Sequence, residues 1–154
     1  MKPVLRPLVL HDFDDAHALY VELVGTIPVP GGPEGMARFS ELLSHPGTTL
    51  VGAEIIGHIR SMVTLHILPN MTFSGRPYAL IENVITAVEY RDRGLSRAVM
   101  QHAIDRAWAA DAYKIMLLTG RELGARGFYE KLGFTTDEKH GLTLRRAPKR
   151  QPLM

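Results

Sequence analysis

One segment constrains the fold more than any other: an apolar run that leads through a charged turn into an amphipathic helix. Ala79–Val88 is apolar and β-branched around Val84-Ile85-Thr86, which predicts a buried strand. Small or apolar residues then recur every fourth position from Leu95, which predicts a helix to about Ala110. A buried strand leading directly into a helix is typical of mixed α/β sheets with helices on their faces.

The remaining patterns extend this unit to a complete domain. Asp12 is expected to cap a helix that Gly25 ends, and Pro33 is expected to open a second helix that ends before Pro46. Gly57 separates two β-branched runs, as in a hairpin. Met100 and Trp108 are assigned to the core. We expect strands at 4–10, 48–56, 58–67, 114–118, 134–136 and 141–146, helices at 13–24, 33–43 and 122–132, and loops at 27–35 and 68–77.

Composition bounds the kind of protein. The 154 residues are 45% hydrophobic and 22% charged with a net charge of +2, which predicts one globular domain, residues 1–147, and a basic tail, 148–154. There is no cysteine, so disulfides and thiolate chemistry are excluded. No run has the length of a bilayer span, and Pro3 and Pro7 interrupt the N-terminal segment, so we expect a cytoplasmic protein without a membrane partner.

The turn after the buried strand has the chemistry of an anion site. Arg91–Arg97 (RDRGLSR) brings three arginines and Gly94 to the start of a helix, where unpaired backbone N–H groups can donate hydrogen bonds to a phosphate oxygen. The segment lacks the lysine of a Walker loop and the spaced glycines of a dinucleotide fingerprint. A purely structural turn remains an alternative on this pattern alone. The seven histidines show no metal-ligand spacing with carboxylates, so no metal is predicted.

Two motifs together resemble the GNAT superfamily of N-acetyltransferases. Arg91, Gly94 and Ser96 stand at the positions of the family's acetyl-CoA pyrophosphate loop, Gln/Arg-x-x-Gly-x-Gly/Ala. Phe128–Phe134 (FYEKLGF) resembles its late helix-to-strand signature. The resemblance covers Ala79–Phe134 and implies an α/β (α+β) fold with six or seven strands, a splayed central pair and about four helices. It also implies acetyl-CoA as co-substrate, and it suggests a homodimer.

The resemblance implies roles for individual residues. Backbone groups in the middle of the splayed strand would pair with the pantetheine arm, and Tyr129 would protonate the departing thiolate. Asp92 departs from the family pattern by placing a carboxylate beside the pyrophosphate, and Glu122 stands where members often carry asparagine. The implied cofactor-binding set is Val84, Ile85, Thr86, Arg91, Asp92, Arg93, Gly94, Leu95, Ser96, Arg97, Glu122 and Tyr129.

Glu82 is the second candidate catalytic residue. A carboxylate among apolar strand residues is costly to bury, so we expect it to face a cleft or a partner. Related small-molecule acetyltransferases share its Ile-Glu strand start. Glu82 would accept the proton of an amine, or bind the ammonium, or form a structural salt bridge. The acceptor pocket is predicted to include Tyr20, His66, Tyr78 and Asn83 with the loops 27–35 and 68–77.

Three functions compete on the sequence. The first is acetyl transfer from acetyl-CoA to a primary amine of a small molecule by direct attack, since no nucleophilic side chain marks a covalent route. A protein amine is a variant of it. The second is a coenzyme A-binding module that has lost turnover, which Asp92 and Glu122 favour. The third, nucleic-acid binding by the basic second half, lacks a motif and interleaved aromatic residues, so no nucleic-acid partner is expected.

Overall fold

A five-stranded mixed sheet forms the centre of the computed structural model, which describes residues 2–121 and 124–150. The strands lie in the order β1 (Val4–Pro7), β2 (Thr48–Ile55), β3 (His58–Leu68), β4 (Tyr78–Thr86) and β5 (Ile115–Met116). Neighbours are antiparallel except β4 and β5, which are parallel. The predicted mixed sheet with helices on its faces is therefore confirmed.

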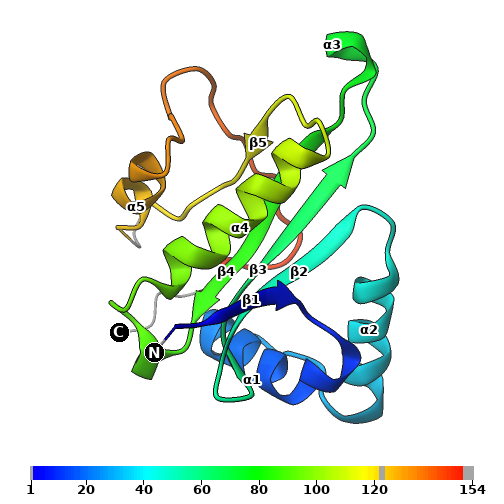
Figure 1. The fold of residues 1–154 in the computed structure, drawn as a ribbon, viewed down its shortest axis with the longest axis vertical. Helices are drawn as coiled ribbons and strands as arrows, with labels where there is room; N and C mark the ends of the chain where they lie inside the picture. The colour runs from blue at the N-terminus through cyan, green and yellow to red at the C-terminus, as the bar shows by residue number, and fades with distance from the viewer. Residues whose placement is uncertain (1, 122–123, 151–154) are drawn as a thin grey trace.

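Helices cover both faces of the sheet (Figure 1). α4 (Leu95–Ala109) packs on one face, while α1 (Phe13–Val24) and α2 (Gly32–Ser44) pack on the other. The short helices are η1 (Leu10–Asp12), α3 (Thr72–Gly75), η2 (Val88–Tyr90) and α5 (Arg126–Lys131). No helix among the described residues is long and apolar enough to cross a membrane.

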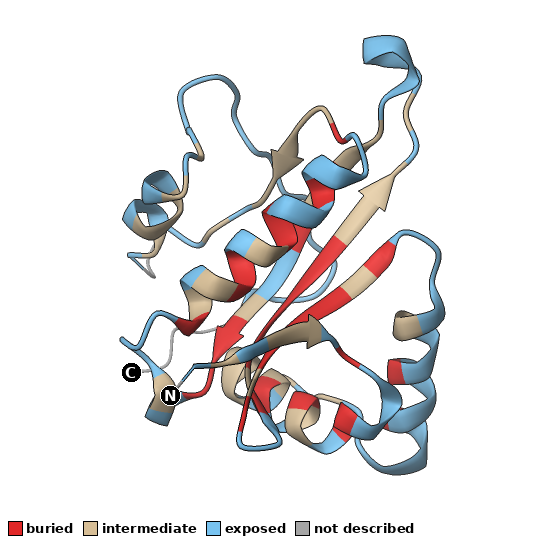
Figure 2. Ribbon diagram, viewed as in Figure 1, coloured by how far each residue is buried: buried red, intermediate tan, exposed pale blue. Residues whose placement is uncertain are grey.

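Each face carries its own core, because alternate side chains of a strand point to opposite sides. Val51, Val63 and Leu65 pack under the α4 residues Val99 and Met100. The buried side chains of the opposite face include Leu50, Met62 and Ile85, which pack against Phe13 and Leu19 of α1 and Phe39 of α2. Buried residues line both sides of the central strands (Figure 2).

The prediction of six or seven strands is wrong for the described residues, where the segments 134–136 and 141–146 form no strand. Strand pairing needs a neighbouring edge, and the outer edge of β5 is only two residues long, Ile115 and Met116. Leu142 and Leu144 are 91% and 101% exposed, so their alternating pattern meets no apolar surface. The β propensity of a segment depends more on packing against neighbouring strands than on an intrinsic backbone preference, so without such packing these segments form no strand.

Smaller corrections concern single residues. Trp108 is not a core residue: it is 52% exposed, although Met100 on the same helix is fully buried. Asp12 does not cap α1 through its side chain, because its carboxylate binds the Arg6 guanidinium at 2.8 Å and accepts the Val9 N–H at 2.8 Å. The predicted loop 68–77 contains the four-residue α3, a fifth α-helix where about four were expected.

Candidate functional site

The site is built around the N-terminus of α4. Gly94 adopts a left-handed conformation (φ +79°) that turns the chain from η2 into the helix, and no side chain caps the helix there. The Ala98 N–H donates to Gly94 O at 3.0 Å, so the N–H groups of residues 95–97 precede the first helical hydrogen bond. A cavity of about 320 Å³ opens beside this turn. Its lining includes Gly94, Leu95, Ser96 and Arg97.

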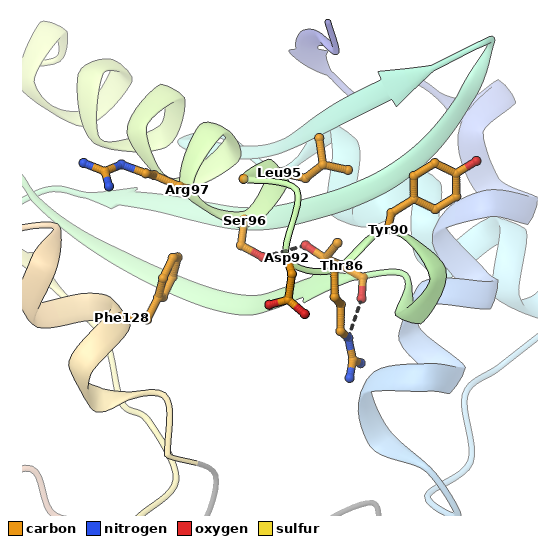
Figure 3. Close-up of a pocket in the computed structure, with 9 residues that line it drawn as sticks. Thr86, Tyr90, Asp92, Leu95, Ser96, Arg97 and Phe128 are labelled. Carbon is orange, nitrogen blue, oxygen red and sulfur yellow. Dashed lines mark hydrogen bonds between the residues drawn. The ribbon is translucent and has the colours of Figure 1, made fainter. Parts of the chain in front are cut away.

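A chain of three hydroxyl groups fixes the first turn of α4 to the sheet. Thr86 Oγ1, at the end of β4, lies 2.7 Å from Ser61 Oγ on β3 and 2.6 Å from Ser96 Oγ on α4. Ser61 also donates to Ile85 O at 3.2 Å. Figure 3 shows Thr86 and Ser96 joined at the edge of the cavity. The position of the open N–H groups is therefore set by the end of the strand.

The charged side chains of the turn have different partners. Arg91 Nε donates to Thr86 O at 3.3 Å, and the Arg93 guanidinium lies 5.0 Å from the centre of the Tyr90 ring. Within the part of the chain that the structure describes, the Asp92 carboxylate forms no ion pair or hydrogen bond, and it lines the cavity opposite Phe128 of α5 (Figure 3). Arg91, Asp92, Arg93 and Arg97 are all exposed. The three arginines favour binding of an anion, and the Asp92 carboxylate opposes it.

The second half of β4 lacks a neighbour on the β5 side among the described residues. β5 pairs only Ile115 with Ala79 and Met116 with Leu80, and the chain then leaves toward α5 (Figure 1). On the β3 side the register shifts by one residue between Met62 and Thr64. Asn83 takes a left-handed conformation (φ +53°) at this bulge. The two strands of the parallel pair therefore diverge beyond Leu80.

Backbone directions at the bulge follow from the pairing on the other side. The Ala87 N–H donates to Arg60 O of β3 at 2.8 Å, and backbone groups alternate in direction along a strand. The backbone groups of Thr86 and Val84 therefore face away from β3, toward the gap that β5 leaves. The Val84 side chain is half-buried against the α4-side core, whereas Ile85 is buried on the opposite face.

Glu82 lies on the open part of the α1 side of β4. Its side chain is exposed although β4 has strands on both sides near its start, and Figure 2 shows the exposed stretch within the strand. Across the register Glu82 faces Thr64. Among the described residues, the ion pairs do not include Glu82, so the structural salt bridge has no support there.

The predicted acceptor residues are only partly brought together. Tyr20 of α1 lies beside Thr64, and burial raises the pKa of its phenol. Its hydroxyl is buried without a hydrogen-bond partner among the described atoms. His66 and Leu80 are cross-strand partners, next to Thr64 and Glu82. Tyr78 is the first residue of β4, and Lys114 Nζ lies 5.7 Å from its ring centre.

Tyr129 is set back from the cavity. Its half-buried ring packs edge-on against Phe128 and Phe134, with ring centres 5.1 and 6.2 Å apart, and only Phe128 lines the cavity. Burial raises the pKa of Tyr129, and the charge of Arg150 partly offsets this. The phenol therefore stays protonated at neutral pH. Glu122 lies outside the described residues.

Sequence reasoning missed Tyr90 and Phe128 in the cavity wall. Tyr90 contacts two guanidinium groups, with Arg60 at 5.1 Å and Arg93 at 5.0 Å from its ring centre. The aromatic residue just before the arginine turn was the available signal. The described residues also hold no group of three or more histidine, aspartate or glutamate side chains arranged to bind a metal.

Comparison with known proteins identifies the family. The model of the acetyltransferase (GNAT) family matches residues 13–134. A putative acetyltransferase from Agrobacterium tumefaciens str. C58 is 40% identical, with a TM-score of 0.88 over 93% of this chain and 99% of that one. Glucosamine 6-phosphate N-acetyltransferase from Trypanosoma brucei brucei is 29% identical over 78% of this chain and 83% of its own length.

A solved aminoglycoside N-acetyltransferase in complex with CoA shares the fold at 15% identity, with a TM-score of 0.77 over 94% of this chain and 95% of that one. The open turn at α4 and the diverging β4–β5 pair thus occur in a chain that belongs to the GNAT family of acetyltransferases.

Proposed function

We propose that this protein transfers the acetyl group of acetyl-CoA to a primary amine of a small molecule. The observation that carries the proposal is the open N-terminus of α4 beside the unpaired edge of β4. An anion-binding turn and a backbone edge with free groups suit the two polar parts of acetyl-CoA, the pyrophosphate and the pantetheine arm. The structural relative that holds CoA supports the same ligand.

In this proposal the chain supplies positioning and charge stabilisation. The N–H groups of residues 95–97 bind the pyrophosphate, with Arg97 at the cavity wall. The Val84 N–H stabilises the negative charge that develops on the carbonyl oxygen during attack. The amine nitrogen forms a bond to the carbonyl carbon, the carbon–sulfur bond breaks, and Tyr129 protonates the thiolate. The new amide nitrogen loses one proton, which passes through water to the Tyr129 phenolate and restores the phenol.

The acceptor side of the proposal rests on Glu82. An exposed carboxylate in mid-sheet, beside the gap of β4, attracts the ammonium form of an amine. The relative named as glucosamine 6-phosphate N-acetyltransferase supports a small-molecule amine over a protein amine. A second candidate, a coenzyme A-binding module without turnover, is favoured by the Asp92 carboxylate in the cavity wall.

Calorimetric titration with acetyl-CoA tests the site. Gly94→Trp places an indole at the mouth of the turn. A Cβ at Gly94 would meet no atom within 4 Å, so the new side chain begins in open space. Gly57→Trp is the matched control, because Gly57 in the β2–β3 turn has a similar φ (+76°) and equally open surroundings, so backbone strain is the same.

We expect binding by wild type and Gly57→Trp, and its loss in Gly94→Trp. Absence of binding by folded wild type contradicts the proposal. Primary amines, glucosamine 6-phosphate among them, are then added and the release of free CoA is measured. The enzyme releases free CoA, whereas the binding module binds acetyl-CoA and releases no free CoA.

A further inference from the structure

A single threonine hydroxyl joins two imidazole rings on the α1 side of the sheet. Thr48 Oγ1 lies 2.8 Å from His66 Nδ1 and 3.0 Å from His45 Nδ1. Thr48 is buried, His66 is half-buried and His45 is exposed. The three groups therefore form a continuous hydrogen-bonded chain from the half-buried interior to solvent.

The turn that carries this chain is fixed to β3. The Thr48 N–H donates to His45 O at 3.1 Å, and the Ile67 N–H donates to Gly47 O at 2.8 Å. A Cβ at Gly47 would lie 2.4 Å from Ile67 O, and φ there is +78°, so the turn requires glycine. His45 is thus held against the strand that carries His66.

His66 faces the same open surface as Glu82. It pairs with Leu80 of β4, and its diagonal neighbours on that strand are Tyr78 and Glu82. Diagonal neighbours in an antiparallel pair lie about 7–8 Å apart, a span that one amine can bridge. Leu80 is also the last residue of β4 that pairs with β5, so this surface adjoins the gap of β4.

The hydrogen-bond pattern requires the two imidazoles to be coupled. A hydroxyl has one proton, so with both rings neutral it donates to one Nδ1 and accepts from the other. One ring is then the Nδ1–H tautomer and the other the Nε2–H tautomer. A proton added to Nε2 of His66 lets its Nδ1 proton pass to Thr48, while the Thr48 proton passes to Nδ1 of His45.

We propose that His66, Thr48 and His45 form a proton relay that takes the proton from the acceptor ammonium and releases it to solvent at His45. This deepens the proposed function and rests on it. Glu82 then binds the ammonium without acting as the base. The amine leaves the relay neutral and ready to attack, His45 holds the charge as an imidazolium, and its Nε2 proton goes to water.

Other ionisable groups near the relay are few in the described part of the chain. Glu82 and Tyr78 face His66 diagonally from β4, and Tyr20 lies beside Thr64, the next residue of β3 on that face. Lys114 lies over the Tyr78 ring. Because Glu82 is exposed, its field is screened by water.

The pH dependence of the rate tests the relay. Thr48→Val removes the hydroxyl with little change of shape. Thr49→Val is the matched control, since Thr49 lies on the other face of the sheet, where its hydroxyl lies 3.5 Å from Arg106 Nη2. We expect kcat of Thr48→Val to fall about tenfold or more at pH 7, with an unchanged KM for the amine.

The deficit of Thr48→Val must shrink as pH rises toward the pKa of the free alkylamine, about 10, because deprotonated amine then needs no base. His66→Gln should show the same pH dependence with a larger deficit, about 100-fold at pH 7. A loss equal at all pH values, or no loss, overturns the relay.

A nitrogen-15 spectrum of the histidine rings tests the hydrogen-bonded chain without any turnover. We expect opposite tautomers for His66 and His45 in wild type and Thr49→Val, and a change of tautomer in Thr48→Val. Identical tautomers, or no response to Thr48→Val, overturn the proposal. Opposite tautomers in a protein that binds acetyl-CoA but acetylates no amine would instead contradict the proposed function, and with it the relay's catalytic role.

Discussion

Thr86→Val should weaken both the fold and the cofactor site, since the Thr86 hydroxyl joins β3 to α4. Valine keeps the shape of threonine and removes the bonds to Ser61 Oγ (2.7 Å) and Ser96 Oγ (2.6 Å). Ser61 keeps its bond to Ile85 O, and half-buried Ser96 remains reachable by water, so neither is left fully unsatisfied. Two net hydrogen bonds at 0.5–1.5 kcal/mol each put the loss of unfolding free energy at about 1–3 kcal/mol.

Urea denaturation measures this loss, with Thr49→Val as the control for a generic threonine-to-valine effect. A loss of 2 kcal/mol corresponds to a Tm decrease of about 4–8 °C for a domain of this size. Acetyl-CoA affinity should fall as well, because Ser96 no longer holds the first turn of α4 against the strand. Unchanged stability and unchanged affinity would refute the argument that this hydroxyl chain positions the open N–H groups.

Three further predictions follow from burial and charge. The Arg6 guanidinium holds the pKa of Asp12 below its usual range. The ion pair therefore contributes its full stabilisation at pH values above the ordinary carboxyl pKa, and this stabilisation is lost as pH falls through the lowered pKa of Asp12. Asp12→Ala should cost about 3 kcal/mol at pH 7, and Asp12→Asn should flatten the dependence of Tm on pH between 6 and 3. Met100→Ala should cost about 2–5 kcal/mol in urea denaturation, whereas Trp108→Ala should cost less than about 1 kcal/mol, because only Met100 is buried. Tyr129→Phe should lower kcat for acetyl transfer by about 100-fold without changing Tm, since the phenol forms no hydrogen bond with the described residues and its ring stays packed.

Local patterns predicted most of the elements. The four-residue spacing after Leu95 and the glycine between two β-branched runs fix α4 and the β2–β3 hairpin by short-range geometry. The Arg91–Arg97 turn was placed correctly for the same reason, because a strand end, a glycine and a helix start are adjacent in sequence. Features that depend on neighbours in sequence could therefore be predicted from the sequence alone.

Features that depend on distant neighbours could not be predicted in this way. The exposure of Trp108 follows from which face of α4 meets the sheet, and its helical spacing from Leu95 does not reveal it. The missing strands at 134–136 and 141–146 follow from the two-residue length of β5. The pairing of Thr48 with His66 depends on the register between two strands, and a shift of one residue would place them on opposite faces.

The role of Glu82 is the part of the site that the sequence determines least. A carboxylate in mid-strand allowed a base, an ammonium binder or a structural salt bridge, and the described residues provide no cation within ion-pair distance of it. An exposed side chain without partners contributes little to stability, so Glu82→Gln should change the unfolding free energy by less than about 0.5 kcal/mol.

The kinetic effect of Glu82→Gln separates the two remaining roles. If Glu82 holds the ammonium while the His66 relay removes the proton, the substitution raises KM for the amine and leaves the shape of the pH profile of kcat unchanged. If Glu82 is itself the base, kcat falls at neutral pH and recovers as pH approaches the pKa of the amine, the behaviour expected here of Thr48→Val. The second result would place the proton acceptor on β4, because a chain can have only one first acceptor for the proton that makes the amine nucleophilic.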